Sequence, residues 1–277
     1  MKKIIFILTL CLLMVLVGCN TETPPAAPEP DEQAEPETPE EPEEEPAAEV
    51  TILLAAAASL KNCIDKELIP MFAEKHPNIT VDATYDSSGK LQAQIEEGAD
   101  VDVFMSAAMK QMNALNDKGL IKKGTIVELL ENKIVLILPI DSLTEIASFE
   151  DILKAETIAV GDPESVPAGQ YAKESFENLG IWEDVSAKAS LGTNVTEVLS
   201  WVAAGSADAG VVYATDAASN ENVKVVAEAP EGSVSKVIYP IGIIDATTKL
   251  EAAQIFTEFL QSEEALSIFE KYGFTAN

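Results

Sequence analysis

The chain has 277 residues and a formal net charge of −29, with 47 acidic residues against 18 basic ones. All 18 basic residues are lysine, because the sequence contains no arginine. A nucleic-acid backbone needs a basic face, so this composition excludes nucleic acid as a partner. An anionic small molecule stays open, because backbone N–H groups at a helix start bind anions without a charged side chain.

The N-terminus has the pattern of an export signal. Lys2-Lys3 precedes an apolar run of about fourteen residues, which is shorter than the roughly 20 residues of a membrane-spanning helix. The run ends in Leu16-Val17-Gly18-Cys19, which resembles the lipobox of bacterial lipoproteins. The resemblance implies removal of residues 1–18 as a signal peptide and a lipid on Cys19, which anchors the protein to the extracytoplasmic face of the cell membrane. The alternative, an ordinary secretory signal with an incidental cysteine, also exports the protein.

Residues 19–49 are then the lipidated cysteine and a tether. Residues 20–49 hold eight of the 15 prolines, twelve acidic residues and no basic one. Such a segment cannot bury enough apolar surface to fold, and its like charges repel one another. We therefore predict a disordered acidic linker between anchor and folded body. The alternative is an acidic recognition tail.

Cysteine usage fits an exported protein without disulfides. Cys11 leaves with the signal and Cys19 would be lipidated, so Cys63 is the one cysteine left for the folded body. No disulfide can then form within the mature chain, which we expect to be a monomer. Cys63 lies on the apolar stripe of a predicted helix with Leu68 and Phe72, which favours buried packing over a reactive thiol.

From residue 50 onward, apolar strand patterns alternate with amphipathic helical patterns. We predict strands at Val50–Leu54, Ile79–Tyr85, Val101–Met105, Lys133–Leu138, Thr157–Val160, Ala209–Tyr213 and Lys236–Ile244. We predict helices at Ser59–Lys75, Gly89–Glu97, Lys110–Lys118, from Pro167 onward, Thr196–Ala204, Leu250–Leu260 and Ser262–Tyr272. The alternation predicts an α/β fold with largely parallel sheets.

Two of the predicted strands, Lys133–Leu138 and Lys236–Ile244, flank the middle third of the chain. We expect residues 50–136 and 238–277 to form one lobe, and residues 137–237 to form a second lobe inserted in the first. The flanking strands would cross between the lobes as a hinge. The expected architecture is two lobes, each a mostly parallel sheet flanked by helices, joined by two hinge strands.

Four small-residue turns each open a predicted helix. A helix start leaves backbone N–H groups without partners and carries about half a positive charge, so it is a ready anion site. Tyr213 ends an apolar strand, from which its phenol can reach out of the core. Ordinary helix capping explains any one turn as well, and the spacing alone does not bring the four together. The turns are Ala57-Ala58-Ser59-Leu60, with Ser59 at an expected N-cap, Ser87-Ser88-Gly89-Lys90, Val166-Pro167-Ala168-Gly169 and Thr193-Asn194-Val195-Thr196.

Six motifs occur in order along residues 50–277: Ala55-Ala56-Ala57-Ala58-Ser59-Leu60, Asp86-Ser87-Ser88-Gly89-Lys90-Leu91, Val101-Asp102-Val103-Phe104-Met105-Ser106-Ala107, Gly161-Asp162-Pro163-Glu164-Ser165-Val166-Pro167-Ala168-Gly169, Gly210-Val211-Val212-Tyr213 and Tyr272-Gly273-Phe274. Together they resemble the molybdate-binding proteins of ABC transporters, a type II periplasmic-binding-protein family. In that family serine hydroxyls with neighbouring amides, two further amides and one tyrosine hydroxyl hold the oxyanion. The resemblance implies the family's two-lobed fold, an ABC permease as partner, no cofactor, and Ser59, Ser88, Ala168, Val195 and Tyr213 as ligands.

The ligand chemistry favours a fully ionised tetrahedral anion. Neutral donors match oxygens that only accept, as in molybdate and tungstate, whereas phosphate often carries a proton and needs an acceptor that none of the five residues provides. Sulfate is smaller, so a pocket set by rigid helix ends should hold it less well. The alternative ligand is another oxyanion such as sulfate or thiosulfate. An aspartate or an arginine in one of the ligand-bearing turns would favour that alternative. The four turns as assigned contain neither.

An exported serine hydrolase using Ser59 or Ser88 is the alternative from another class. The one histidine, His76, stands before Pro77 and far in sequence from both serines. No Gly-x-Ser-x-Gly elbow and no His/Cys cluster for a catalytic metal occur. A serine–lysine pair such as Ser87 with Lys90 stays possible, although a solvated lysine at a helix start is the simpler interpretation of Lys90. We therefore expect a binding protein and no enzyme.

Overall fold

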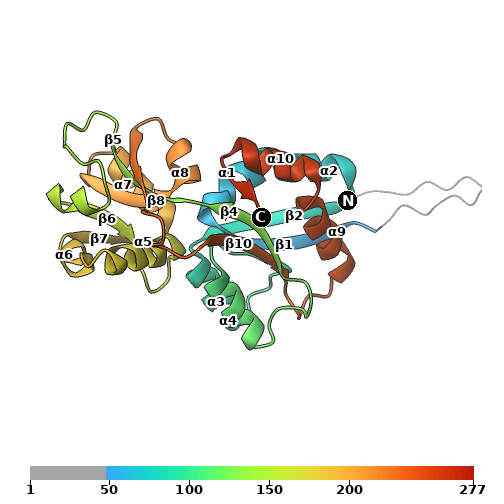
Figure 1. The fold of residues 1–277 in the computed structure, drawn as a ribbon. Coiled ribbons are helices and arrows are strands. Elements are labelled where there is room, and N and C mark those ends of the chain that lie inside the picture. The colour runs from blue at the N-terminus through green and yellow to red at the C-terminus, as the bar shows by residue number, and fades with distance from the viewer. Residues whose placement is uncertain (1–47) are drawn as a thin grey trace, which may run out of the picture. The chain divides into compact units, whose positions relative to one another are not determined.

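The computed structural model describes residues 48–277, which lie within one structural unit. The expected signal peptide of residues 1–18, the lipidation site Cys19 and all but the end of the tether lie outside the described residues. The described part is built on two separate sheets, each flanked by helices (Figure 1). We call the part built on the first sheet the first lobe and the part built on the second sheet the second lobe.

The first lobe has a six-stranded sheet in the order β11-β4-β10-β3-β1-β2. Strand β1 runs parallel to β2 and to β3, because helical segments connect these strands. The strands are β1 (Val50–Ala57), β2 (Ile79–Asp86), β3 (Val103–Met105), β4 (Val127–Asn132), β10 (Val237–Ile243) and β11 (Thr275–Ala276). The helical segments are η1 (Ala58–Leu60), α1 (Lys61–Cys63), η2 (Ile64–Leu68), α2 (Ile69–Lys75), α3 (Ser88–Glu96), α4 (Met109–Asp117), α9 (Leu250–Leu260) and α10 (Glu263–Lys271).

The second lobe has a five-stranded sheet in the order β7-β6-β8-β5-β9. Its central strands are fully buried, as their continuous apolar sequences require. The strands are β5 (Ile134–Pro139), β6 (Ile158–Gly161), β7 (Ala189–Gly192), β8 (Ala209–Tyr213) and β9 (Val223–Glu228). The helical segments are η3 (Glu150–Lys154), α5 (Pro167–Asn178), α6 (Trp182–Ser186), α7 (Val195–Ala203) and α8 (Ala214–Ala218).

Both sheets are mixed, which corrects the expectation of mostly parallel sheets. Strand β10 pairs antiparallel with β3 and β4, and β5 pairs antiparallel with β8 and β9. The reason is the route of the chain. It passes from the first sheet to the second between Asn132 and Ile134 and returns between Glu228 and Val237, and the first strand after each crossing, β5 and then β10, runs against the parallel units. The α/β, two-lobed architecture itself is confirmed.

Strands β4, β7, β9 and β11 have no counterpart among the predicted strands. Strands β7 and β9 are edge strands whose side chains are largely exposed or half-buried, so they lack a continuous apolar run. The long helix predicted from Ser59 is a series of short helical segments with a π-helical turn at Ile64–Leu68, just before Pro70. Proline lacks an N–H, which explains the irregular turn at this point.

Cys63 is buried and free, as its place on the apolar stripe predicts. Burial raises the pKa of its thiol to about 12, so it stays protonated and inert. Within residues 48–277, the helices are too short or too polar for any of them to cross a membrane.

Candidate functional site

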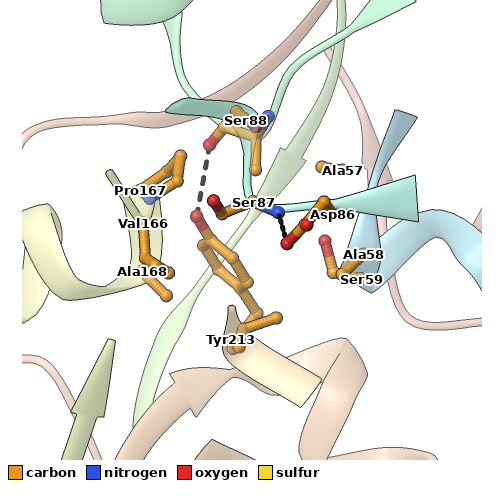
Figure 2. Close-up of a pocket in the computed structure, with 12 residues that line it drawn as sticks. Ala57, Ala58, Ser59, Asp86, Ser87, Ser88, Val166, Pro167, Ala168 and Tyr213 are labelled. Atoms are coloured by element: carbon orange, nitrogen blue, oxygen red, sulfur yellow. Dashed lines mark hydrogen bonds between the residues drawn. The ribbon is translucent and has the colours of Figure 1, made fainter. Parts of the chain in front are cut away.

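The five residues predicted as ligands line one small pocket between the two lobes (Figure 2). The pocket is small, with a cavity volume of about 10 Å³, close to the space that one water molecule needs. Helices α3, α5 and α7 all begin at this pocket, and each start contributes unpaired N–H groups and a partial positive charge. The lining residues are Ala57, Ala58, Ser59, Asp86, Ser87, Ser88, Ala107, Val166, Pro167, Ala168, Val195 and Tyr213.

Ser59 follows the end of β1, in the tight turn η1. The sequence predicts Ser59 as an N-cap, and this is wrong. The turn begins at Ala58, so the cap position is Ala57, two residues before the expected cap, and Ala57 makes no side-chain cap bond. The Ser59 hydroxyl instead lies 2.9 Å from the Tyr239 hydroxyl of β10. The side chain is thereby held at the pocket wall by a strand far away in sequence.

Ser88 is the first residue of α3, and Ser87 before it is the N-cap, whose Oγ accepts from the Lys90 N–H at 3.4 Å. The Ser88 side chain is fully buried, and its Oγ accepts a hydrogen bond from the Ala107 N–H at 3.0 Å. The hydroxyl proton of Ser88 is therefore free to point at a ligand.

Ala168 lies in the first turn of α5, which begins at Pro167 as predicted. The preceding Val166 makes no side-chain cap bond, so the first amides of the helix are not capped from that residue. Gly169 has a packing role, because a Cβ there would lie 1.9 Å from the Gly161 carbonyl oxygen. The start of α5 can approach β6 this closely only with glycine at residue 169.

Val195 is the first residue of α7, and Asn194 caps the helix by accepting from the Glu197 N–H at 3.0 Å. Glu197 in turn accepts from the Thr193 N–H at 2.7 Å. This is a variant of the capping box, in which Glu197 accepts from the residue before the cap. It fixes the first turn of α7 and presents the Val195 amide at the pocket.

Tyr213 ends β8, and its hydroxyl donates to the Ala107 carbonyl oxygen at 3.3 Å, across the boundary between the lobes. The side chain is almost completely buried. Burial raises the pKa of Tyr213 well above its usual value, so the phenol keeps its proton and stays a donor.

Asp86 is a pocket residue that is absent from the predicted ligand turns. It ends β2, and its Oδ1 accepts from the Ser87 N–H at 2.7 Å, from Lys90 Nζ at 3.3 Å and from Asn194 Nδ2 at 3.4 Å. Asp86 therefore lines the pocket from the last residue of β2, one residue before the predicted turn that begins at Ser87. The available signal was the position of Asp86 directly before the Ser87 cap.

The two lobes touch on several sides of this pocket. The Gly89 N–H donates to the Ser165 carbonyl oxygen at 2.9 Å, and Gln111 Nε2 donates to Gln170 Oε1 at 3.1 Å. Together with the bonds from Asp86 and Tyr213, these contacts join the two sides of the pocket. In the part of the chain that the structure describes, no group of three His, Cys, Asp or Glu residues is placed to hold a metal ion.

Comparisons with known proteins agree with this architecture. YvgL of Bacillus subtilis (strain 168), provisionally named an ABC transporter substrate-binding lipoprotein, is 39% identical over 99% of this chain and 98% of the relative. The molybdate-binding protein ModA of Escherichia coli (strain K12) is 38% identical over 83% of this chain and 90% of that protein. A solved substrate-binding domain from Clostridium difficile, provisionally assigned to a molybdenum ABC transporter, is 38% identical with a TM-score of 0.64, covering 82% of this chain and 98% of the domain.

The family model for bacterial extracellular solute-binding proteins matches residues 52–275, which is nearly the whole folded body. The match includes both sheets and every residue that lines the pocket. The chain belongs to the family of bacterial extracellular solute-binding proteins.

Proposed function

We propose that this protein binds molybdate, and tungstate in the same way, and delivers the anion to an ABC permease. The observation that carries the proposal is the meeting of Ser59, Ser88, Ala168, Val195 and Tyr213 at one small pocket where three helices begin. The names of the ModA relatives and of the Clostridium difficile domain support molybdate as the ligand.

The donors suit an anion whose oxygens only accept hydrogen bonds. We assign the hydroxyls of Ser59, Ser88 and Tyr213 and the amides of Ala168 and Val195 as donors, together with the amides of Ser59 and Ser88. The Tyr213 proton, which is donated to the Ala107 carbonyl oxygen in this structure, would turn to the ligand. None of these groups is charged, so the attraction comes from short-range hydrogen bonds and from the dipoles of α3, α5 and α7. The small cavity volume supports a compact inorganic anion over an amino acid, a sugar or a peptide.

Binding would occur by closure of the two lobes, proposed as residues 50–136 with 238–277 and residues 137–237, with the whole of β5 (Ile134–Pro139) counted in the second lobe and the whole of β10 (Val237–Ile243) in the first. Each lobe supplies donors: Ser59 and Ser88 come from the first, and Ala168, Val195 and Tyr213 from the second. A ligand held by both lobes favours the closed population, because separating the lobes removes some of its contacts. The two chain crossings near Lys133 and Val237 would act as the hinge.

The place of action would be the outer face of the cell membrane. We propose that a lipid on Cys19 anchors the protein and that residues 20–49 tether a monomeric receptor beside its permease. The name of the YvgL relative, which includes the word lipoprotein, supports the anchor. We also propose binding without catalysis, since the lining residues include neither a histidine nor a lysine to serve as a general base for Ser59 or Ser88.

Isothermal titration of the full-length chain with molybdate, tungstate, sulfate and phosphate tests the proposal. We expect one-to-one binding of molybdate and tungstate with a Kd below about 1 µM, or about −8 kcal/mol. Sulfate and phosphate at millimolar concentration should not compete. Tight sulfate or phosphate binding would keep the receptor and overturn the ligand, and no binding of any oxyanion would overturn the function.

A further inference from the structure

We propose that Asn132 and Tyr239 are positioning residues that act on the ligand through Ser59. Through a chain of hydrogen bonds they fix the Ser59 hydroxyl as a donor into the pocket, which makes the site selective for anions without a proton at that oxygen. This inference rests on the proposed function, because it takes the pocket to bind an oxyanion. Tyr239 and Asn132 do not line the pocket themselves.

The first step is the orientation of the Asn132 side-chain amide at the end of β4. Its Oδ1 accepts from the backbone N–H of Lys133 at 2.8 Å, and a backbone N–H can only donate. The amide nitrogen therefore faces the other way. Its two hydrogens go to Thr215 Oγ1 at 2.9 Å and to the Tyr239 hydroxyl oxygen at 3.3 Å. Asn132 thus offers Tyr239 only a donor.

The second step is the single proton of the Tyr239 phenol. The hydroxyl has two side-chain hydrogen-bond partners, Asn132 Nδ2 at 3.3 Å and Ser59 Oγ at 2.9 Å, and in the pair with Ser59 the geometry allows either oxygen to donate. Because Asn132 already donates, the Tyr239 proton has Ser59 as its acceptor. Burial raises the pKa of Tyr239 well above its usual value, so this proton stays on the phenol.

The third step is the Ser59 hydroxyl. It accepts from Tyr239, so its own proton must find another acceptor, and the side chain lies at the wall of the pocket. The Ser88 hydroxyl is also an acceptor toward the protein, but with no intervening side chains, because its Oγ accepts directly from the backbone N–H of Ala107 at 3.0 Å. Ser59 and Ser88, the two serines proposed as ligands, thus each accept one hydrogen bond from the protein and keep their own proton for the ligand.

The consequence is a preference for oxygens that carry no proton. A deprotonated oxygen accepts from Ser59, and each bond in the chain strengthens the next. A ligand O–H at the same place would face another donor, and one of the two would lose its partner, which is costly in a buried site. The chain of bonds from Asn132 therefore disfavours a protonated ligand oxygen at the Ser59 position, and this discrimination does not depend on the size of the pocket.

The test is a double-mutant cycle between Tyr239 and Ser59 in the full-length chain, read by isothermal titration with molybdate. Tyr239→Phe removes the hydroxyl and keeps the ring, which packs 5.4 Å from Tyr213 and 5.2 Å from Phe274 between ring centroids. We expect the Kd to rise about tenfold, as for loss of one hydrogen bond to a charged group. In a Ser59→Ala background, Tyr239→Phe should change the Kd less than about twofold. The matched control is Tyr171→Phe, another buried phenol outside the pocket, which should leave the Kd unchanged.

A second variant, Asn132→Asp, reverses the direction of the chain. A carboxylate accepts from Tyr239, which then accepts from Ser59, so Ser59 no longer donates to the ligand. We expect a larger loss than for Tyr239→Phe, and most of it should vanish in the Ser59→Ala background, where only the added charge acts. Equal losses in both backgrounds, for either variant, would overturn the positioning role.

The outcomes separate this inference from the proposed function. If the unmodified protein binds molybdate and the losses are additive, the role of Asn132 and Tyr239 falls and the function stands. If the unmodified protein binds sulfate and not molybdate, the assignment of molybdate as the ligand is overturned. The same double-mutant cycle, titrated with sulfate, then tests the positioning role of Asn132 and Tyr239. If it binds no oxyanion, both are overturned.

Discussion

The backbone amide of Gly89 in the first lobe donates to the Ser165 carbonyl oxygen in the second lobe at 2.9 Å. A Cβ atom at residue 89 would lie 2.3 Å from that oxygen and 2.7 Å from the Ser165 Cα atom, distances that real side chains do not reach. The lobes therefore meet backbone to backbone directly beside Ser88 and the pocket. Only glycine permits this contact.

Gly89→Ala should weaken molybdate binding about tenfold or more, because the added methyl group must push Ser165 away before the lobes can close. The dissociation rate should rise more than the association rate falls, since the closed complex loses the contact. Stopped-flow fluorescence and isothermal titration measure both.

The matched control for that change is Gly98→Ala, just beyond the end of α3. Gly98 has a φ of +90°, and a Cβ atom there would have no neighbouring atom within 4 Å, so alanine strains the backbone without touching the second lobe. It should cost about 1 kcal/mol of unfolding free energy and leave the Kd unchanged. Unaltered binding by Gly89→Ala would contradict the role given to the backbone contact.

Tyr213→Phe and Ser88→Ala should separate affinity from stability. The Tyr213 hydroxyl makes one long bond of 3.3 Å to the Ala107 carbonyl, so its removal should raise the molybdate Kd about tenfold with little change in melting temperature. Ser88→Ala also leaves the buried Ala107 N–H without its 3.0 Å partner, which should cost about 1–3 kcal/mol of unfolding free energy as well as affinity. Titration and thermal unfolding of both variants check this. Equal melting temperatures would contradict the buried bond to Ser88.

The parts of the site that could be predicted from the sequence are those that depend only on neighbouring residues in the chain. The Asn194 cap and Pro167 at the start of α5 are properties of a few consecutive residues, so the helix starts were readable. The bond between Ser59 and Tyr239 joins residues 180 positions apart, and no local pattern carries it. The Gly89 contact with Ser165 likewise depends on how the two lobes meet. Local sequence identifies the donors, and tertiary packing decides which of them are held in place.

Asp86→Asn should strengthen binding of a dianion on the order of threefold to tenfold. The Asp86 carboxylate lies at the pocket wall and repels a negative ligand, while asparagine keeps an oxygen that can accept from the Ser87 N–H. Titration of molybdate at low and high salt measures the gain, which should shrink as salt screens the charge.

Asp82→Asn is the control for Asp86, because it makes the same charge change on an exposed side chain of the same strand. It should change the Kd little. A weaker complex with Asp86→Asn would show instead that the carboxylate is needed to hold Lys90 and Asn194 in place across the lobes.

Asp216 should make stability fall as the pH rises. It is buried in α8, its Oδ2 has no hydrogen-bond partner among the described residues, and burial raises its pKa to about 7 from 3.8. Between these values the folded state binds a proton that the unfolded state has lost, so the stabilising neutral form is lost as the pH rises through 7. Asp216→Asn stays neutral and should therefore gain melting temperature over the unmodified protein at pH 8 and keep only a smaller part of that gain at pH 5. Thermal unfolding of both proteins from pH 5 to pH 8 measures the difference, and a difference that does not change with pH would contradict a buried ionising carboxyl at this position.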